Sequence, residues 1–264
     1  TLFTTDHSIN KLKETILQLA VMGKLVPQDP SDEPASVLLE KIAAEKERLV
    51  KEGKIKKQKP LPKVSDEEKL DLISENWQTS RLGNLGVTST GKTPSTSNSE
   101  FFVGNIPFVG PGQITPTGNW IKSDKSLSDT GLQQSSEANP NDILMVCIGG
   151  SIGKSAIALE NIAFNQQINA IKPLFIEPRY LKFAITTKRF YRAIIDNSSG
   201  SATPIINRSK WEALVVPIPP LAEQHRIVAK VDELMALCDQ LRSSLQKAQE
   251  TQILLTDAVV ENAL

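Results

Sequence analysis

The first part of the chain carries apolar residues at helical spacing in two stretches. The first stretch repeats every three to four positions, which predicts a helix over residues 8–20 with Ser8 as its N-cap. The second predicts a helix that begins at Ser31 or Asp32 and ends at Gly53, a residue suited to a helix C-terminus. An N-terminal helical region is therefore expected.

After these helices the pattern changes to short apolar runs. Residues 54–63 contain five lysines and two prolines, which predicts an extended basic linker. Beyond Trp77, apolar runs alternate with clusters of Gly, Pro, Asn, Ser and Thr, and each run predicts a strand. The runs are residues 106–109, 143–148, 156–159, 168–171 and 214–218. With one helix expected near residues 178–195, residues 64–220 are predicted to form an α+β domain.

The last part of the chain, residues 221–264, predicts one long helix. It contains no proline or glycine, and its apolar positions alternate at spacings of four and three residues, the seam of a coiled coil. About 40 helical residues make a rod roughly 60 Å long, which has little to pack on in the middle domain and needs a partner helix. The positions expected to contact that partner are Ile227, Val231, Leu234, Cys238, Leu241, Leu245, Leu255 and Val259.

Charge is unevenly distributed, although the chain as a whole is neutral. Residues 77–220 carry 13 basic and 9 acidic side chains, whereas residues 1–76 and 221–264 are slightly acidic. A net charge of +4 on residues 77–220 permits nucleic-acid binding but does not by itself indicate it.

Cysteine usage and the short apolar runs predict a cytoplasmic protein. Cys147 and Cys238 lie far apart within apolar stretches, which argues against a disulfide scaffold. The longest apolar run, residues 143–148, is too short to cross a membrane. Charged residues interrupt the first residues of the chain, so no signal peptide is expected.

Two glycine-rich segments resemble cofactor-binding motifs without completing them. Residues 149–155, Gly-Gly-Ser-Ile-Gly-Lys-Ser, have one residue too few between their glycines for a phosphate-binding P-loop. A turn between two strands is expected there instead. Residues 108–112 match the short aromatic-x-Gly-x-Gly pattern of methyl-donor sites, but Pro111 and Pro116 interrupt the helix that such a site needs.

The sequence shows no constellation of metal ligands and no nucleophile with a base. His7 and His225 are its two histidines, and neither has another ligand at metal-binding spacing. Most Asp and Glu residues fall on helix faces expected to be solvated. We therefore expect a chain with no catalytic residue, no metal and no cofactor.

Two long blocks near the ends of the chain carry a more specific signal. The first, residues 15–63, includes Gly-Lys-Leu-Val-Pro-Gln-Asp-Pro, and the second, residues 217–241, includes Pro-Pro-Leu-Ala-Glu-Gln-His-Arg-Ile. Both resemble the conserved regions of specificity subunits of type I restriction-modification systems. Between them, Gly-Lys-Thr-Pro-Ser at 91–95 and Ala-Thr-Pro-Ile at 202–205 resemble segments of that family's target recognition domain.

The chain departs from this family in its length. Members usually carry two recognition domains and two conserved helical regions, whereas this chain has one recognition domain, residues 64–220. It lies between an N-terminal conserved region, residues 1–63, and one long helix, residues 221–264. A half-length subunit is therefore expected, natural or truncated, and the lack of a methionine before Thr1 fits either. Because the family pairs its two long helices, we expect this helix to form a homodimer that reads a split, inverted-repeat site.

The resemblance implies double-stranded DNA as the target of residues 77–220. Methyltransferase subunits, docked on the conserved helices, are the implied partners that supply the cofactor and the chemistry, and a motor-nuclease subunit is a further implied partner. Asn and Gln pair with adenine and Arg or Lys with guanine, while Lys, Arg, Ser and Thr hold phosphates. The candidate DNA-binding residues are Lys92, Thr93, Ser95, Asn119, Lys122, Asn165, Gln166, Gln167, Ser199, Ser201, Thr203 and Arg208.

Two other interpretations remain open. A folded domain on a coiled-coil rod is also the form of a protein-interaction module that does not bind DNA. Salt-sensitive binding to DNA distinguishes the two. A self-sufficient methyltransferase is the third interpretation, and binding of a methyl donor by the isolated chain tests it.

Overall fold

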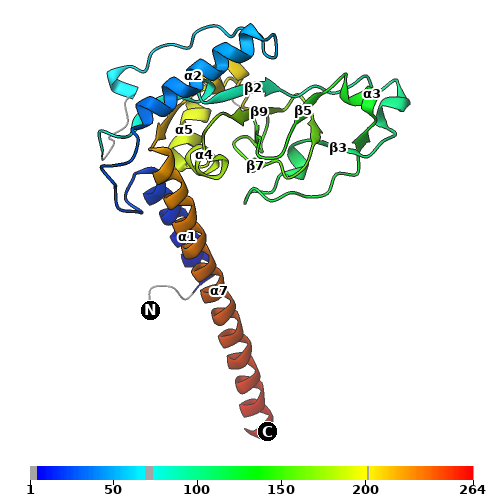
Figure 1. Ribbon diagram of the computed structural model, residues 1–264. Coiled ribbons are helices and arrows are strands. Elements are labelled where there is room, and N and C mark those ends of the chain that lie inside the picture. Colours follow the sequence, from blue (N-terminus) through cyan, green and yellow to red (C-terminus); the bar gives the residue numbers. More distant parts are fainter. Residues whose placement is uncertain (1–4, 69–73, 201, 264) are drawn as a thin grey trace.

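The computed structural model describes residues 5–68, 74–200 and 202–263, with side chains up to residue 258. A domain of helices and short strands carries one long helix, which projects from it as a rod (Figure 1). The expected α+β class is confirmed.

The first helix, α1 (Asp6–Val21), begins with a capping box. Thr5 Oγ1 accepts a hydrogen bond from the Ser8 amide at 3.2 Å, and Ser8 Oγ accepts one from the Thr5 amide at 3.2 Å. Ser8 is therefore the third residue of the helix and not its N-cap as predicted.

The second helix, α2 (Ala35–Lys51), begins later than predicted. The Ser31 hydroxyl and amide both donate to Asp29 Oδ1, at 2.6 and 2.9 Å, so Ser31, where the helix was predicted to begin, belongs to a turn. Gly53 adopts φ +70° just beyond the helix and ends it, as predicted.

The basic linker, residues 54–63, contains no helix or strand, but it is anchored to the domain. Gln58 Nε2 donates to Thr88 Oγ1 at 3.2 Å, and Arg81 Nε donates to the Pro62 carbonyl at 3.1 Å. We call this segment the basic strap, because its lysines are exposed while its backbone is held against the domain.

The described strands form three sheets. β1 (Gln78–Arg81) pairs antiparallel with β10 (Val215–Ile218), which joins the two ends of the middle domain. The second sheet is antiparallel, in the order β2 (Gly86–Thr90), β9 (Ile168–Pro173), β6 (Ile143–Val146) and β7 (Ser155–Ile157). The third has the order β4 (Ser126–Leu127), β3 (Ile106–Val109), β8 (Ile162–Phe164) and β5 (Ser136–Ala138), with β3 and β8 parallel.

All five runs predicted as strands contain a strand, namely β3, β6, β7, β9 and β10. β1, β2, β4, β5 and β8 were not predicted. β1 and β2 are mostly polar, and the other three are only two or three residues long. The single helix predicted near residues 178–195 is two helices, α4 (Pro178–Ile185) and α5 (Lys188–Asn197). Thr187 separates them, because its side chain accepts a hydrogen bond from the Phe190 amide at 3.3 Å and caps α5.

The remaining short helices are α3 (Asp129–Leu132), α6 (Arg208–Glu212), η1 (Asp66–Glu68), η2 (Leu82–Asn84), η3 (Ser99–Phe102) and η4 (Pro111–Gln113).

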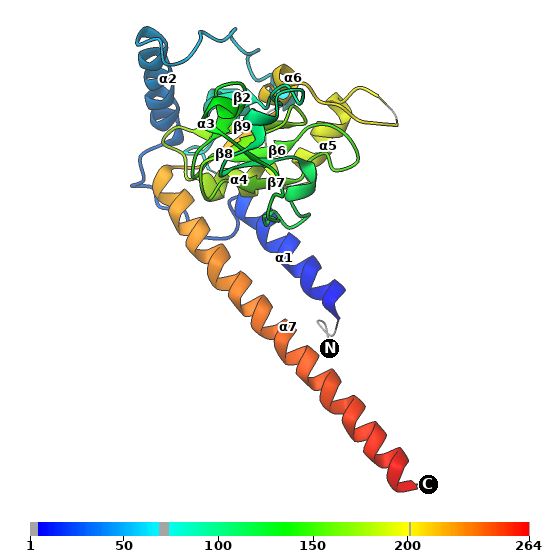
Figure 2. The ribbon, with the colours of Figure 1, turned by 90° about the vertical axis from the view of Figure 1, so that its right-hand side faces the viewer.

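The long helix predicted at the end of the chain is α7 (Leu221–Ala263), about 65 Å long. α1 lies antiparallel beside its first half, as both views of the ribbon show (Figures 1 and 2). Lys13 forms an ion pair with Asp239 at 2.5 Å, and Arg242 forms one with Asp6 at 3.2 Å. At about 24 Å, α1 leaves the rest of α7 uncovered.

This contact corrects the prediction that the whole apolar seam of α7 binds another copy. Ile227, Val231 and Cys238 are buried at 0, 2 and 3% exposure within the chain's own core, which includes Ile9 and Ile16 of α1. Leu234, Leu241 and Leu245 pack partly buried against the same core. A side chain already covered by α1 is not available to a second copy unless α1 moves away.

The far end of the seam is different. Leu255 is 63% exposed, and its neighbours Ile253 and Leu254 are exposed as well. The side chain of Val259 lies outside the described residues. None of the helices in the described parts of the chain combines the length and apolarity needed to cross a membrane.

Candidate nucleic-acid interface

The loop after β2, residues 91–98, lies directly against the β8–β9 loop, residues 165–167. Thr93 Oγ1 donates a hydrogen bond to Gln166 Oε1 at 2.6 Å. Two candidate DNA-binding side chains from distant parts of the sequence therefore meet at one place.

Gly91 makes this contact possible. Its amide donates to the Ile168 carbonyl at 2.9 Å. An ideal Cβ on Gly91 would lie 1.9 Å from the carbonyl oxygen of Asn165, far inside van der Waals contact. Glycine is needed here because two backbones approach each other more closely than any side chain allows.

Two further loops join this pair through Cys147. The Cys147 amide donates to the Gln167 carbonyl at 2.8 Å, and the Cys147 carbonyl accepts from the Ile206 amide at 3.0 Å. The Gly149 amide donates to the Pro204 carbonyl at 2.9 Å, so the β6–β7 loop also holds the segment before α6. We call the joined segments the reading loops: residues 91–98, 147–154, 165–167 and 198–207.

The reading loops hold most of the candidate residues predicted from the sequence. The exposed ones are Lys92, Ser95, Gln166, Ser199 and Thr203. Asn165 and Gln167 are partly buried and bond to each other, with Nδ2 of Asn165 donating to Oε1 of Gln167 at 3.2 Å, so their amides hold the loop. Ser201 lies outside the described residues.

Three candidates lie outside the reading loops. Asn119 belongs to a turn in which its amide donates to Thr115 Oγ1 at 2.8 Å. Lys122 lines a separate groove of about 540 Å³, beside the exposed Leu159. Arg208 pairs with Glu212 at 3.2 Å, which leaves less of its charge for a phosphate. The structure therefore does not join these three to the main cluster.

A buried polar residue, Asn169, supports the base of the reading loops. Its Oδ1 accepts from Thr90 Oγ1 at 2.8 Å, and its Nδ2 donates to Cys147 Sγ at 3.2 Å. Thr90 precedes one reading loop and Cys147 begins another, so Asn169 ties both to β9. Burial raises the pKa of the Cys147 thiol to about 12, so the thiol stays protonated and unreactive near neutral pH.

The segments that resembled cofactor motifs have other structures. Residues 149–154 form the expected turn between β6 and β7, and β3 is followed by the single turn η4 (Pro111–Gln113). Within the described ranges, no three or more His, Cys, Asp and Glu side chains gather where they could hold a metal ion.

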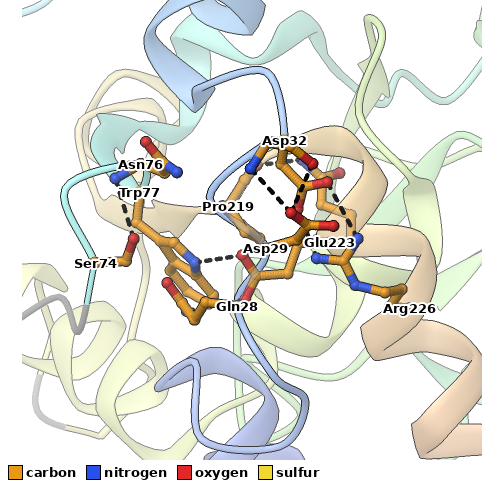
Figure 3. A network of polar contacts seen from close by, with 11 residues as sticks. Gln28, Asp29, Asp32, Ser74, Asn76, Trp77, Pro219, Glu223 and Arg226 are labelled. Atoms are coloured by element: carbon orange, nitrogen blue, oxygen red, sulfur yellow. Dashed lines mark hydrogen bonds and ion pairs between the residues drawn. The ribbon is translucent and has the colours of Figure 1, made fainter.

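A second polar cluster is buried where α7 leaves the domain (Figure 3). Glu223, 1% exposed, accepts hydrogen bonds from Trp77 Nε1 at 2.9 Å and from Gln28 Nε2 at 3.1 Å. One turn later, both terminal nitrogens of Arg226 bond to the carboxylate of Asp32, at 3.2 and 2.5 Å. We call this cluster the helix junction: Gln28, Asp32, Trp77, Glu223 and Arg226.

The helix junction fixes the direction in which α7 leaves the domain, because it joins the segments before α2 and before β1 to the first turns of α7. Burial raises the pKa of Glu223, and the hydrogen bond from Trp77 and the charge of Arg226 oppose that shift. Glu223 is an exception to the expectation that most acidic residues lie on solvated helix faces. A buried carboxyl group with two donors aimed at it is costly to disturb.

Comparisons with known proteins match this architecture. Residues 74–250 match the family described as type I restriction modification DNA specificity domain. The chain belongs to this family. The resemblance predicted from the two end blocks is thereby confirmed, and membership of a DNA specificity family agrees with the expectation that the chain is not itself an enzyme.

Curated members of the family resemble the chain along its whole length. The specificity subunits of the type I restriction enzymes EcoAI and EcoEI, both of Escherichia coli, are each 36% identical to it. These alignments cover 100% of this chain and 46% of each relative. The chain therefore spans less than half the length of these specificity subunits.

Solved structures support the fold. The crystal structure of the HsdS subunit from Thermoanaerobacter tengcongensis matches with a TM-score of 0.52 and 19% identity, over 92% of this chain and 49% of that one. A second solved structure concerns complex assembly and conformational transition of the type I R-M system. It matches with a TM-score of 0.50 and 17% identity, over 92% of this chain and 54% of that one.

Two features of the site escaped sequence reasoning. Four of the five residues of the helix junction lie in the two blocks that carried the family resemblance, but periodicity does not show that they meet. Asn169 had a recognisable signal, because it is the one polar residue in the apolar run 168–171, and a lone polar group in a buried strand needs a partner.

Proposed function

We propose that this chain recognises one half of a split double-stranded DNA target and holds methyltransferase subunits beside it. The observation that carries the proposal is the convergence of the reading loops, in a chain that belongs to a DNA specificity family. Exposed amide, hydroxyl and ammonium groups gather there, as expected of a surface that reads base edges and phosphates.

Within the reading loops, Gln166 is the best placed base reader. It is exposed, and its bond to Thr93 fixes the side chain while Nε2 makes no hydrogen bond to any residue in the described ranges. An amide held in this way can bond to both N6 and N7 of adenine. Lys92 and Ser95 are the proposed phosphate contacts of the same loop.

The direct test is co-purification with a matching methyltransferase subunit, followed by mapping of methylated adenines in genomic DNA. We expect a stable complex and methylation at an interrupted, inverted-repeat motif. Under this proposal, a motor-nuclease subunit joins the same complex. The complex acts in the cytoplasm, and the two free cysteines fit that location. A complex without methylation, together with no salt-sensitive DNA binding, would favour a protein-interaction module instead.

We further propose that two copies pair through the uncovered end of α7. The supporting observations are the exposed seam residue Leu255 and the end of the α1 contact at Leu245. A two-fold pair would place two sets of reading loops on one duplex and make the target an inverted repeat.

Leu255→Lys should therefore split the dimer. The substitution places a charge in the uncovered seam but leaves the α1–α7 contact intact, so sedimentation should show a monomer with an unchanged circular dichroism spectrum. Ser243→Lys is the matched control, since Ser243 is exposed and lies opposite the seam by heptad position. A wild-type chain that sediments as a monomer at micromolar concentration would contradict the dimer.

A further inference from the structure

Helix α5 presents a cationic face that the candidate residues did not include. Arg189 and Arg192 are fully on its exposed side, while Phe190 and Ile194, at 3 and 0% exposure, anchor the opposite side in the core. α5 lies at the edge of the domain, next to the loop that contains residues 198–207 (Figure 2).

The charges on this face are largely uncompensated. Lys188 pairs with Glu14 of α1 at 2.7 Å. Neither Arg189 nor Arg192 forms an ion pair with a residue in the described ranges. Asp196 is the one acidic residue of α5, so the helix itself has a net charge of +2.

The stability of α5 by itself disfavours basic residues at these positions. Lys188 and Arg189 occupy the first turn of α5, where the helix dipole favours acidic residues, and no acidic residue is present there. Arg192 adds a like charge three positions after Arg189 and four after Lys188, which costs an isolated helix about 0.2–0.5 kcal/mol for each pair. Charges placed against the local preference of a helix point to an external anion as their partner.

The cationic face adjoins two reading loops. An ideal Cβ on Gly153 would lie 2.7 Å from the ring of Tyr191, so this half-exposed ring covers the β6–β7 loop directly. At the other end of α5, Lys210 Nζ donates to the Asn197 carbonyl at 3.0 Å, just before the loop of residues 198–207. A duplex seated on these loops would bring its backbone to α5.

We propose that Arg189 and Arg192 bind the sugar-phosphate backbone of the duplex that the reading loops recognise, with Tyr191 packed between the helix and the β6–β7 loop. This inference rests on the proposed function and adds residues to it. Phosphate contacts of this kind set the position and strength of binding but do not distinguish one base from another.

The test is the double variant Arg189→Ala/Arg192→Ala in the full chain, titrated against a short duplex with the methylated motif and a shuffled duplex at several salt concentrations. We expect both affinities to fall by the same factor, so the preference for the motif is unchanged. The slope of log K against log salt should become shallower by about 1.8, since each phosphate neutralised by the protein contributes about 0.9 to it. Arg189→Lys/Arg192→Lys should retain the wild-type slope.

The matched control is Lys57→Ala/Lys59→Ala in the basic strap, which removes the same charge from exposed residues outside the reading loops. An equal change of slope in this control would show a diffuse effect of net charge and overturn the proposal. An unchanged slope in the arginine variant, with unchanged circular dichroism, would also overturn it. If the wild-type chain binds neither duplex, the proposed function fails and this inference fails with it.

Discussion

Gly91→Ala should remove sequence-specific DNA recognition. The new methyl group would overlap the Asn165 carbonyl oxygen, so the two loops would have to separate by about 1 Å. That shift breaks the hydrogen bond between Thr93 and Gln166 and displaces both from the duplex. A side chain that pairs well with one base supplies about 1–3 kcal/mol of discrimination, so the preference for the motif over a shuffled duplex should fall at least tenfold.

Gly112→Ala is the control for this substitution. Gly112 lies in the same domain, but an ideal Cβ there meets no atom within 4 Å, so its replacement should leave binding and stability nearly unchanged. Both variants are measured by fluorescence anisotropy with the two duplexes and by thermal melting. Retention of full discrimination in Gly91→Ala would show that the close approach of these loops is not needed for recognition.

Glu223→Ala should destabilise the fold more than any surface substitution. It leaves the buried Trp77 Nε1 and the partly buried Gln28 Nε2 without their acceptor, at about 1–3 kcal/mol for a buried group, so the free energy of unfolding should fall by about 3 kcal/mol. Glu223→Gln should be far milder. Its oxygen can still accept from Trp77, and its new amide can donate to Gln28 Oε1, a buried atom without a hydrogen-bond partner among the described residues.

The two variants should also differ from wild type in their dependence on pH. Burial raises the pKa of Glu223 above its usual value of 4.5, so the unfolded chain loses this proton at lower pH than the folded chain. The stability contributed by the protonated carboxyl is complete below about pH 4.5 and is lost as pH rises through the folded-state pKa. Relative to wild type, Glu223→Gln should therefore gain stability as pH rises above 4.5.

Urea unfolding followed by tryptophan fluorescence at several pH values measures the free energy of unfolding of each variant and its dependence on pH. If Glu223→Gln is as damaging as Glu223→Ala, the negative charge beside Arg226 matters more than the hydrogen bonds. If Glu223→Ala displaces α7, single copies should still bind DNA, because the helix junction does not form part of the reading loops. Methylation at the split motif should decline, because the helix junction sets the direction of α7.

The local pattern of the sequence determined α1, α2, α7 and five of the described strands, in their order along the chain. The proline-free heptad seam predicted α7, Gly53 marked the end of α2, and five apolar runs marked strands in the middle domain. These signals are local because helix and strand each impose a period on the residues they bury. The family resemblance likewise came from contiguous blocks, and it correctly indicated a DNA specificity domain.

The partner of the α7 seam was decided by tertiary structure. An apolar stripe shows that a helix must be covered, but burial is not directional, so it does not show which surface covers it. The chain's own core, which includes residues of α1 and α4, buries Ile227 and Val231 in the first half and leaves Leu255 exposed. The proposed dimer is therefore assigned only to the uncovered far end of the seam.

For the candidate site, too, the sequence determined one part and the tertiary structure another. Sequence alone identified polar loops and named Lys92, Thr93 and Gln166, because those residue types suit base edges and phosphates. Which loops meet depends on the strand order β2-β9-β6-β7, since long-range pairing brings distant loops together. The buried bonds of Asn169 and Glu223 were equally beyond local pattern, because a polar side chain shows its need for a partner but not the partner's position.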